Sequence, residues 1–222
     1  MNTPTTERPI EQQAIGQIAV DLPGATAIFR RLKLDFCCGG QVSLGEACER
    51  KGLDTARVVA ELAALRRDDA APETPDANAL IDHILTRYHA VHREQLPELV
   101  RMARRVEAVH SDHPDAPHGL AEHLEIMEVE LLEHMEKEEQ VLFPAIEGGS
   151  SGLAGPITVM RDEHIGHGEH LERLAALTHD HTPPQGACNT WCALYAGTAQ
   201  LTNDLISHIH LENNVLFARF GA

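Results

Sequence analysis

A pattern of ten residues occurs twice in this chain and restricts its fold more than any other feature. HMEKEEQVLF at 134–143 returns as HIHLENNVLF at 208–217, and both copies read His-x-x-x-Glu-x-x-Val-Leu-Phe. Side chains four residues apart lie on the same face of an α-helix. Each copy therefore predicts a helix that presents one histidine and one glutamate side by side.

The repeat extends to the segment that precedes each copy. The two copies are 208 − 134 = 74 residues apart, which is the length expected of a two-helix unit. An HxxH pair lies 44 or 45 residues before each copy, formed by His89 with His92 and by His164 with His167. This register indicates an internal duplication, in which a helix with HxxH is followed by a helix with HxxxE.

Four long stretches carry apolar residues at three- and four-residue spacing, as amphipathic helices do. The segments between them, HSDHPDAP, EGGSSGLAG and HDHTPPQGA, are rich in the proline, glycine or serine that end helices. The sequence predicts an all-α fold with an antiparallel four-helix bundle. The predicted helices span 78–110, 118–147, 156–178 and 188–219.

A smaller helical domain is predicted before the bundle. The first part of the chain contains short helical stretches interrupted by proline and glycine. It is followed by RRDDAAPETPDAN, where charges and two prolines oppose helix continuation. The expected division is a small helical N-terminal domain at 1–67, a linker at 68–77 and the bundle at 78–222.

Six side chains of the duplicated pattern can converge on the bundle axis. Four imidazoles and two carboxylates are more than one tetrahedral ion can use, and they fit two metal ions bridged by the carboxylates. This ligand set, without thiolate, favours iron or manganese over softer metals, and zinc or copper are expected only as contamination in vitro. His92 and His167 can replace His89 and His164, because a three-residue offset stays near the same helix face. The candidate ligands are His89, His134, Glu138, His164, His208 and Glu212.

Three acidic residues lie close to these candidates along the chain. Glu130 and Asp204 precede the histidines of the two HxxxE pairs by one helical turn, where a carboxylate can hold an imidazole N–H. Glu163 directly precedes a candidate ligand and can act as a proton donor or a further ligand. A solvated helix charge is the competing interpretation for all three. The two Val-Leu-Phe tails are predicted to lie in the apolar core.

The vicinal pair Cys37–Cys38 lies in DFCCGG at 35–40. The two glycines permit positive φ at a helix end and leave the thiols approachable. The pair is interpreted either as redox or iron-transfer thiols or as part of a helix cap with incidental thiols. The remaining cysteines, Cys48, Cys188 and Cys192, are expected in the apolar core.

Composition argues against several kinds of partner. Acidic residues exceed basic ones by 34 − 18 = 16, so the chain lacks the basic footprint that nucleic acids require. The sequence has no run of about 18 apolar residues, which argues against a membrane span. The N-terminus also lacks the basic start and apolar stretch of a secretory signal. We expect a cytoplasmic protein.

Taken together, these motifs resemble a known family. LDFCCGG, YHAVHREQLPEL, HMEKEEQVLFP, RDEHIGHG and HIHLENNVLF occur in this order over nearly the whole chain. They are similar to the repair-of-iron-centres family, the ScdA-type proteins with a haemerythrin-like domain. The resemblance implies two non-haem iron ions per chain, joined by an oxo bridge, with the four histidines as terminal ligands and Glu138 and Glu212 as bridges. It also associates Glu130 and Glu163 with the centre or with channels leading to it.

The resemblance further implies a function in the stress response. Such a protein restores iron–sulfur clusters damaged by nitric oxide or peroxide, by donating iron to the damaged iron–sulfur proteins. Two alternatives stay open. One is an enzyme that reduces nitric oxide to nitrous oxide at the di-iron centre, and the other is a sensor or carrier that binds oxygen or nitric oxide reversibly. A homodimer is compatible with the family.

Overall fold

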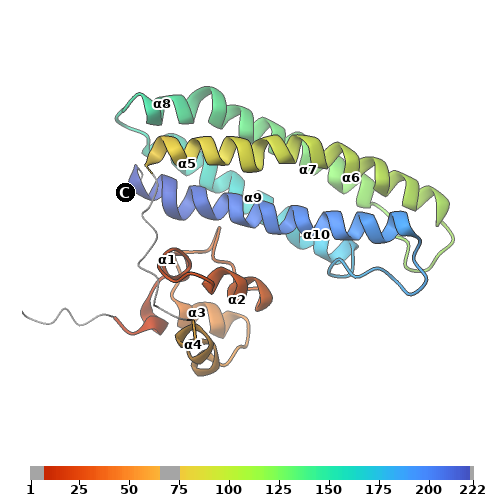
Figure 1. The fold of residues 1–222 in the computed structure, drawn as a ribbon, viewed down its shortest axis with the longest axis horizontal. Helices are drawn as coiled ribbons and strands as arrows, with labels where there is room; N and C mark the ends of the chain where they lie inside the picture. Colours follow the sequence, from red (N-terminus) through yellow and green to blue (C-terminus); the bar gives the residue numbers. More distant parts are fainter. Residues whose placement is uncertain (1–7, 66–75, 221–222) are drawn as a thin grey trace, which may run out of the picture.

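Four long helices form an antiparallel bundle, and a group of short helices packs against one side of it (Figure 1). The computed structural model describes residues 8–65 and 76–220. These residues form no β-strand, only an isolated bridge between Ala14 and Ser43. The all-α prediction is confirmed. Within the described ranges, no helix combines the length and the apolarity needed to cross a bilayer.

Each bundle helix lies close to its predicted range, and three of the four are continuous runs of shorter segments. The first helix consists of α5 (Ala77–Ile84), η2 (Leu85–His89) and α6 (Ala90–Val109). The second consists of α7 (Leu120–Lys137), η3 (Glu138–Leu142) and α8 (Phe143–Glu147). The third is α9 (Ala154–Leu177), and the fourth consists of α10 (Asn189–His210), η4 (Leu211–Leu216) and η5 (Phe217–Arg219).

The segments η2, η3 and η4 are π-helical turns, and each contains a candidate ligand. His89 ends η2, Glu138 begins η3 and Glu212 lies in η4. A π turn inserts an extra residue and re-aims the side chains around it, and such turns are frequent at functional sites. The repeated HxxxE pattern therefore runs into an irregular turn in both of its copies.

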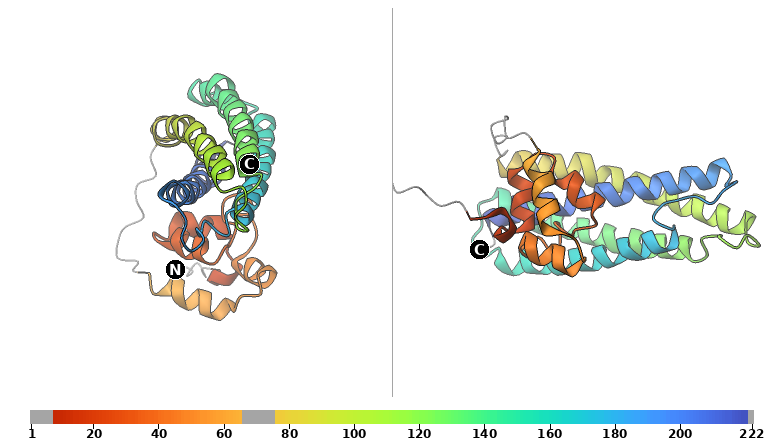
Figure 2. Two further views of the ribbon diagram at one scale, coloured as in Figure 1. Left: turned by 90° about the vertical axis from the view of Figure 1, so that its right-hand side faces the viewer. Right: turned by 90° about the horizontal axis from the view of Figure 1, so that it is seen from below.

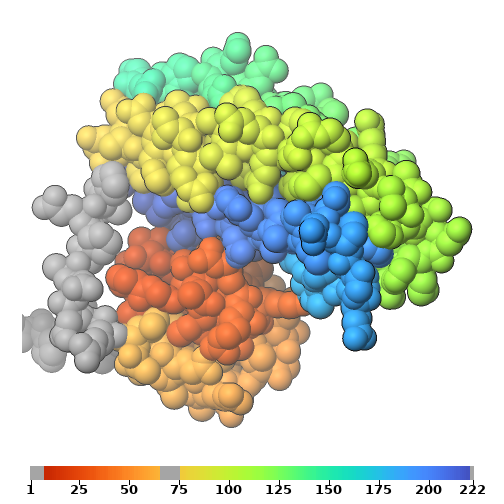
Figure 3. Space-filling model, turned by 45° about the vertical axis from the view of Figure 1, so that its right-hand side comes forward, coloured from red at the N-terminus to blue at the C-terminus, as the bar shows by residue number. Residues whose placement is uncertain are grey.

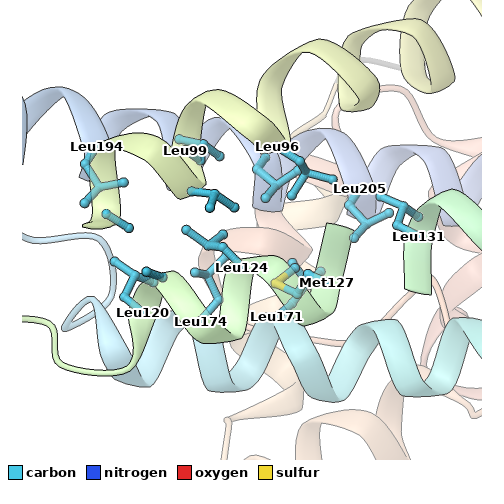
Figure 4. Close-up of a cluster of buried hydrophobic side chains, with 14 of the residues drawn as sticks. Leu96, Leu99, Leu120, Leu124, Met127, Leu131, Leu171, Leu174, Leu194 and Leu205 are labelled. Carbon is cyan, nitrogen blue, oxygen red and sulfur yellow. The ribbon is translucent and has the colours of Figure 1, made fainter. Parts of the chain in front are cut away.

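The bundle interior contains two apolar clusters, and the candidate ligands lie where one cluster gives way to the other along each helix. One cluster includes Leu96, Leu131 and Leu171 (Figure 4). The other includes Leu142 and Phe143 and lies toward the opposite end of the same helices. The predicted burial of these two residues is confirmed, but the preceding Val141 is 61% exposed. The predicted burial of Val141 is wrong, because three consecutive residues span more than half of a helix circumference and cannot all face the core.

The N-terminal part has its own apolar cluster. Its helices are η1 (Ile10–Gln12), α1 (Ile15–Asp21), α2 (Ala25–Arg31), α3 (Leu44–Arg50) and α4 (Thr55–Ala63). The side chains of Ser43 and Asp54 cap α3 and α4.

Cys48 is fully buried as expected, whereas Cys188 and Cys192 lie exposed at the start of α10, which contradicts their predicted burial. Most of the predicted linker lies outside the described residues, and the domain boundaries stay a prediction.

The N-terminal helices pack against α9 and α10 (Figures 2 and 3). Asn214 in η4 donates from Nδ2 to the carbonyl oxygen of Phe36 at 3.0 Å. The Phe36 ring meets His210 edge-on, with ring centroids 5.1 Å apart. Arg30 donates to Ser207 Oγ at 2.9 Å. The DFCCGG segment is thereby held against the helix that carries His208 and Glu212.

Glycine permits the close approach at this contact. A Cβ added to Gly16 would lie 2.6 Å from Asn214 Oδ1 and 3.0 Å from Gly40 O.

We expect Gly16→Ala to lower the free energy of unfolding by about 1–3 kcal/mol, the usual cost of overpacking. The control is Gly166→Ala in the middle of α9, where an added Cβ meets nothing within 4 Å. It should stabilise the helix by about 0.5–1 kcal/mol. Urea unfolding measures both, and equal effects would contradict the tight contact.

Candidate metal centre

The six side chains of the duplicated pattern meet inside the bundle. They form two groups, in each of which the possible ligand atoms lie within 4.8 Å of one another. All six side chains are buried, with at most 1% exposed. The first group contains His89 and His208, the second contains His134 and His164, and both contain Glu138 and Glu212.

The two imidazoles of each group face each other. The Nε2 atoms of His89 and His208 are 3.1 Å apart, and those of His134 and His164 are also 3.1 Å apart. The first pair comes from the first and fourth bundle helices, and the second pair comes from the second and third. The predicted duplication therefore appears in space as two matching pairs of nitrogen ligands.

The two glutamates connect these pairs. Glu138 Oε2 lies 3.4 Å from a histidine Nε2 of the first group and 3.5 Å from one of the second. The oxygens of Glu212 lie 2.9 Å from a histidine Nε2 of the first group and 3.1 Å from one of the second. Each carboxylate therefore reaches both groups, as a carboxylate that bridges two ions must.

The charges at the site depend on one another. Burial opposes a charge on His134, but the carboxylates of Glu138, Glu212 and Glu163 together outweigh it and raise the pKa of His134 to about 9. Burial likewise opposes a charge on His89, and the carboxylates of Glu138, Glu212 and Glu139 together raise its pKa. Burial also opposes the charge on Glu212, yet the facing histidines hold its pKa well below the usual value. Positive charge is thus what stabilises the two carboxylates, whether protons or a cation supply it.

The site contains buried polar atoms that lack hydrogen-bond partners. Both carboxylate oxygens of Glu138 and one oxygen of Glu212 are in this state. A buried carboxylate without donors is strongly destabilising unless a cation compensates it. Imidazole nitrogens with carboxylate oxygens, and no thiolate, suit iron or manganese. The residues present therefore fit a pair of metal ions.

Three of the four imidazoles are oriented by an acceptor on their outer nitrogen. A donor hydrogen on Nδ1 leaves the Nε2 lone pair directed at the centre, which is the tautomer that a metal ligand needs. The three pairs are His89 Nδ1 with Glu139 Oε1 at 2.7 Å, His134 Nδ1 with Glu163 Oε2 at 2.8 Å, and His164 Nδ1 with Asn213 Oδ1 at 2.9 Å.

The two acceptor carboxylates are kept ionised by basic neighbours. Glu139 also accepts from Arg93 at 2.8 Å, and Glu163 accepts from Lys137 at 2.6 Å. Partial burial opposes their charge, but hydrogen bonds from the histidines and from these basic side chains hold the pKa of both glutamates below the usual value. Both glutamates are therefore ionised at neutral pH and can accept the histidine N–H.

Two of the predicted neighbouring carboxylates make other contacts. Glu130 accepts a hydrogen bond from His170 Nε2 at 2.8 Å, and Asp204 accepts from Arg87 at 2.6 Å. Among the described residues, neither carboxylate accepts a hydrogen bond from the histidine one turn later. The reason is geometric: when Nε2 of His134 faces the centre, Nδ1 faces the neighbouring helix instead of its own.

Glu163 contacts the centre through His134, across the bundle, and not through the adjacent His164. Its proton-donor or ligand role stays a prediction. Sequence reasoning missed Glu139 and Asn213. Both directly follow a candidate bridging glutamate, at equivalent places in the repeat, since 139 + 74 = 213. Extending the comparison of the two copies by one residue would have found them.

The second histidines of the HxxH pairs lie outside both groups. His92 is 0% and His167 is 5% exposed, and burial lowers their pKa values to about 3 and about 2. They are therefore neutral imidazoles. The geometry brings His89 and His164 to the glutamates, so the alternative that His92 and His167 replace them is not supported.

The cysteine pair is hydrogen-bonded to two residues of the centre, the candidate ligand His164 and its acceptor Asn213. Cys38 Sγ donates to the backbone oxygen of His164 at 3.2 Å, and Asn213 Nδ2 donates to the backbone oxygen of Cys37 at 3.0 Å. The two Sγ atoms are 3.5 Å apart and form no disulfide. With Asp35 they make up a third group of possible ligand atoms.

The thiols border open space. A cleft of about 1080 Å³ between the N-terminal part and α9 is lined by Asp35, Cys37 and Cys38. The hydrogen bond with Cys38, together with burial, raises the pKa of Cys37 well above its usual value. Cys37 is therefore a protonated thiol at neutral pH, and Cys38 is the more accessible of the two.

A bundle of this kind, with imidazoles and carboxylates gathered between its helices, defines a haemerythrin-like cation-binding protein. The family model of the haemerythrin HHE cation binding domain matches residues 80–220. This chain belongs to that family. A second model, a domain of unknown function (DUF542), matches residues 11–66. A haemerythrin domain implies a non-haem iron site, and the buried cluster described above fits one.

Proteins similar over nearly their whole length carry the name iron-sulfur cluster repair protein YtfE. The one from Musicola paradisiaca (strain Ech703) is 47% identical over 212 residues, which cover 94% of this chain and 96% of that protein. The one from Yersinia pseudotuberculosis (strain PB1/+) is 49% identical over 212 residues, covering 93% and 96%. The one from Citrobacter koseri is 48% identical over 210 residues, with the same coverage.

Asn213 offers a specific test of the orienting contacts. Asn213→Ala removes the acceptor for His164 Nδ1, and we expect the affinity for a ferrous or cobaltous ion to fall about tenfold to a hundredfold, as for other partners of metal-binding histidines. Competition with a chelator measures this. The control is Asn203→Ala, an exposed position on α10. An Asn213→Ala protein with unchanged affinity would contradict the orienting role.

Proposed function

We propose that this chain holds two non-haem iron ions and uses them to repair iron–sulfur clusters damaged by nitric oxide or peroxide. The observation that carries the proposal is the pair of buried imidazole groups that share two glutamates. The relatives named as iron–sulfur cluster repair proteins support the same function. In this proposal the ligands are His89, His134, Glu138, His164, His208 and Glu212.

The charge of the site agrees with two ferric ions. Six positive charges are reduced to roughly two by two glutamates and an oxo bridge, and neutral histidines add nothing. The groups bound directly to the ions would then neutralise most of their positive charge. This matters because an uncompensated charge is strongly destabilising in an apolar interior. Bound iron would supply a one-electron couple and a labile cation for donation.

The contacts around the site support a transfer of iron or electrons toward the N-terminal part of the chain. Asn213 contacts both His164 and Cys37, so one side chain links a proposed ligand to the cysteine segment. Asp35, Cys37 and Cys38 offer a carboxylate and two thiols at the edge of the cleft. We assign to these thiols the transfer of iron or electrons between the centre and a damaged protein that docks there.

The test is to mix the ferrous protein anaerobically with a dehydratase whose cluster has been damaged. We expect more activity to return than with the same amount of free iron, because the protein holds ferrous iron ready for the acceptor. No advantage over free iron would rule out repair by donation.

Variants connect this repair to the site. Glu138→Ala and Glu212→Ala should keep their helices, lose one or both irons and lose repair, because each removes a proposed bridge. Glu133→Ala, at an exposed position on α7, should behave as the wild type. Circular dichroism and iron analysis per chain accompany the assay. Two irons retained in Glu138→Ala would show that the ligand assignment is wrong.

A second candidate function is the reduction of nitric oxide. Two ligand groups joined by shared glutamates would place two ions side by side, which favours coupling of two nitric oxide molecules. The balance is two NO, two electrons and two protons giving N₂O and water, with the electrons from an external reductant. Headspace gas analysis after anaerobic addition of nitric oxide tests it. Nitrosyl accumulation without N₂O would exclude turnover, and clean release on purging would indicate a carrier or sensor.

A further inference from the structure

Two exposed cysteines and a histidine lie at the end of the bundle where α6 finishes and α10 begins (Figure 1). Cys188 is the N-cap of α10, and Cys192 follows it on the same helix face, one turn further on. His110 is the C-cap of α6. Because α6 contains 20 residues, His110 lies about 30 Å along the bundle from His89. This group is therefore separate from the six candidate ligands of the centre.

The histidine and the first cysteine are in contact. Nε2 of His110 lies 3.3 Å from Sγ of Cys188. A tetrahedral zinc ion, with bonds of about 2.0–2.1 Å to nitrogen and about 2.3 Å to sulfur, holds these two atoms about 3.6 Å apart. The two side chains therefore lie almost at the spacing of two zinc ligands. A hydrogen bond from the thiol to the imidazole is the competing interpretation of this contact.

A buried tryptophan supports the imidazole. The ring of Trp191 packs on that of His110, with centroids 5.0 Å apart. Trp191 belongs to the first turn of α10, between the two cysteines in the chain. It thus fixes His110 over the turn that carries both thiols. The N-terminal end of a helix also favours negative charge, and so stabilises thiolates at this place.

The second thiol points toward the same turn. Sγ of Cys192 donates to the backbone oxygen of Ala187 at 3.7 Å, so it is directed back toward the start of α10. Among the described residues, the groups of ligand atoms within 4.8 Å of one another do not include it. Cys192 must therefore rotate about its side-chain bonds to complete the set. Its exposure allows this rotation without loss of core packing.

A second histidine nearby does not belong to the set. The ring of His113 also contacts Trp191, at 5.3 Å between centroids, but its Nδ1 accepts the backbone N–H of Asp115 at 3.1 Å. A neutral imidazole that accepts at Nδ1 carries its hydrogen on Nε2 and has no further lone pair for a metal.

We propose that His110, Cys188 and Cys192 bind one soft metal ion of the zinc type and thereby fasten the end of α6 to the start of α10. Two thiolates and one imidazole are a known zinc ligand set, with water in the fourth position. Thiolates select zinc or copper(I) over harder ions. Binding of a divalent ion releases the two thiol protons, so the two thiolates neutralise its charge. The site does not depend on the proposed function.

Zinc is the probe, added in one equivalent to the full chain loaded with iron. X-ray absorption at the zinc edge detects zinc alone and should show two sulfur neighbours at about 2.3 Å and one imidazole at about 2.0–2.1 Å. Competition with a chelator measures the affinity. His110→Ala, Cys188→Ser and Cys192→Ser should each weaken it by more than about a hundredfold, because loss of a ligand costs more than loss of a ligand's hydrogen-bond partner.

Two matched controls accompany these variants. His118→Ala replaces an exposed histidine of the segment between α6 and α7. The double variant Cys37→Ser/Cys38→Ser removes the thiols at the cleft. Both should bind zinc as the wild type does, with the same sulfur neighbours.

Three results would overturn the inference. One is a wild-type affinity for zinc in Cys188→Ser, and another is the loss of the sulfur neighbours in Cys37→Ser/Cys38→Ser. The third is zinc without sulfur neighbours in the wild type, which would leave the contact of Cys188 with His110 as a hydrogen bond alone. A chain that binds zinc through these thiols but holds no iron would instead contradict only the proposed function.

Discussion

The burial of two carboxylates inside a helical bundle is the constraint on which the rest of this structure depends. An ionised glutamate in such an interior is destabilising by several kcal/mol unless opposite charge and donors surround it. Glu138 and Glu212 lie between four imidazoles and otherwise face apolar clusters. The two π turns that contain these glutamates, and the third that ends at His89, re-aim side chains locally so that the compensating groups can meet.

The duplicated halves differ where the second group meets the N-terminal part. In the first half the residue after the bridging glutamate is Glu139, a charged acceptor that a neighbouring arginine also holds. The equivalent residue in the second half is Asn213. An amide both accepts and donates, so it can receive the N–H of His164 and donate to Cys37 O at the same time. A carboxylate could not make the second bond. This difference between the two copies of the repeat lets Asn213 connect the second ligand group to the cysteine segment.

The parts of the site that sequence reasoning predicted are those set by short-range periodicity. The pairs His134–Glu138 and His208–Glu212 follow from a four-residue spacing on one helix, and the helix ranges follow from apolar spacing. The predictions for Glu130 and Asp204 used the same rule and were wrong in their contacts. Those contacts depend on which way an imidazole edge points across the bundle, and no spacing along one helix contains that information.

By itself the sequence determined the four helices, their duplication and the six residues that could gather between them, because helical periodicity and repeat register are properties of the chain. Only the tertiary structure decided which acceptor orients each histidine. It also decided that the cysteine pair lies against His164 and Asn213, and that both ring nitrogens of His92 and Nε2 of His167 find no hydrogen-bond partner among the described residues. The physical reason is that these are contacts between segments far apart in sequence, set by the packing of whole helices and of the N-terminal part on α9 and α10.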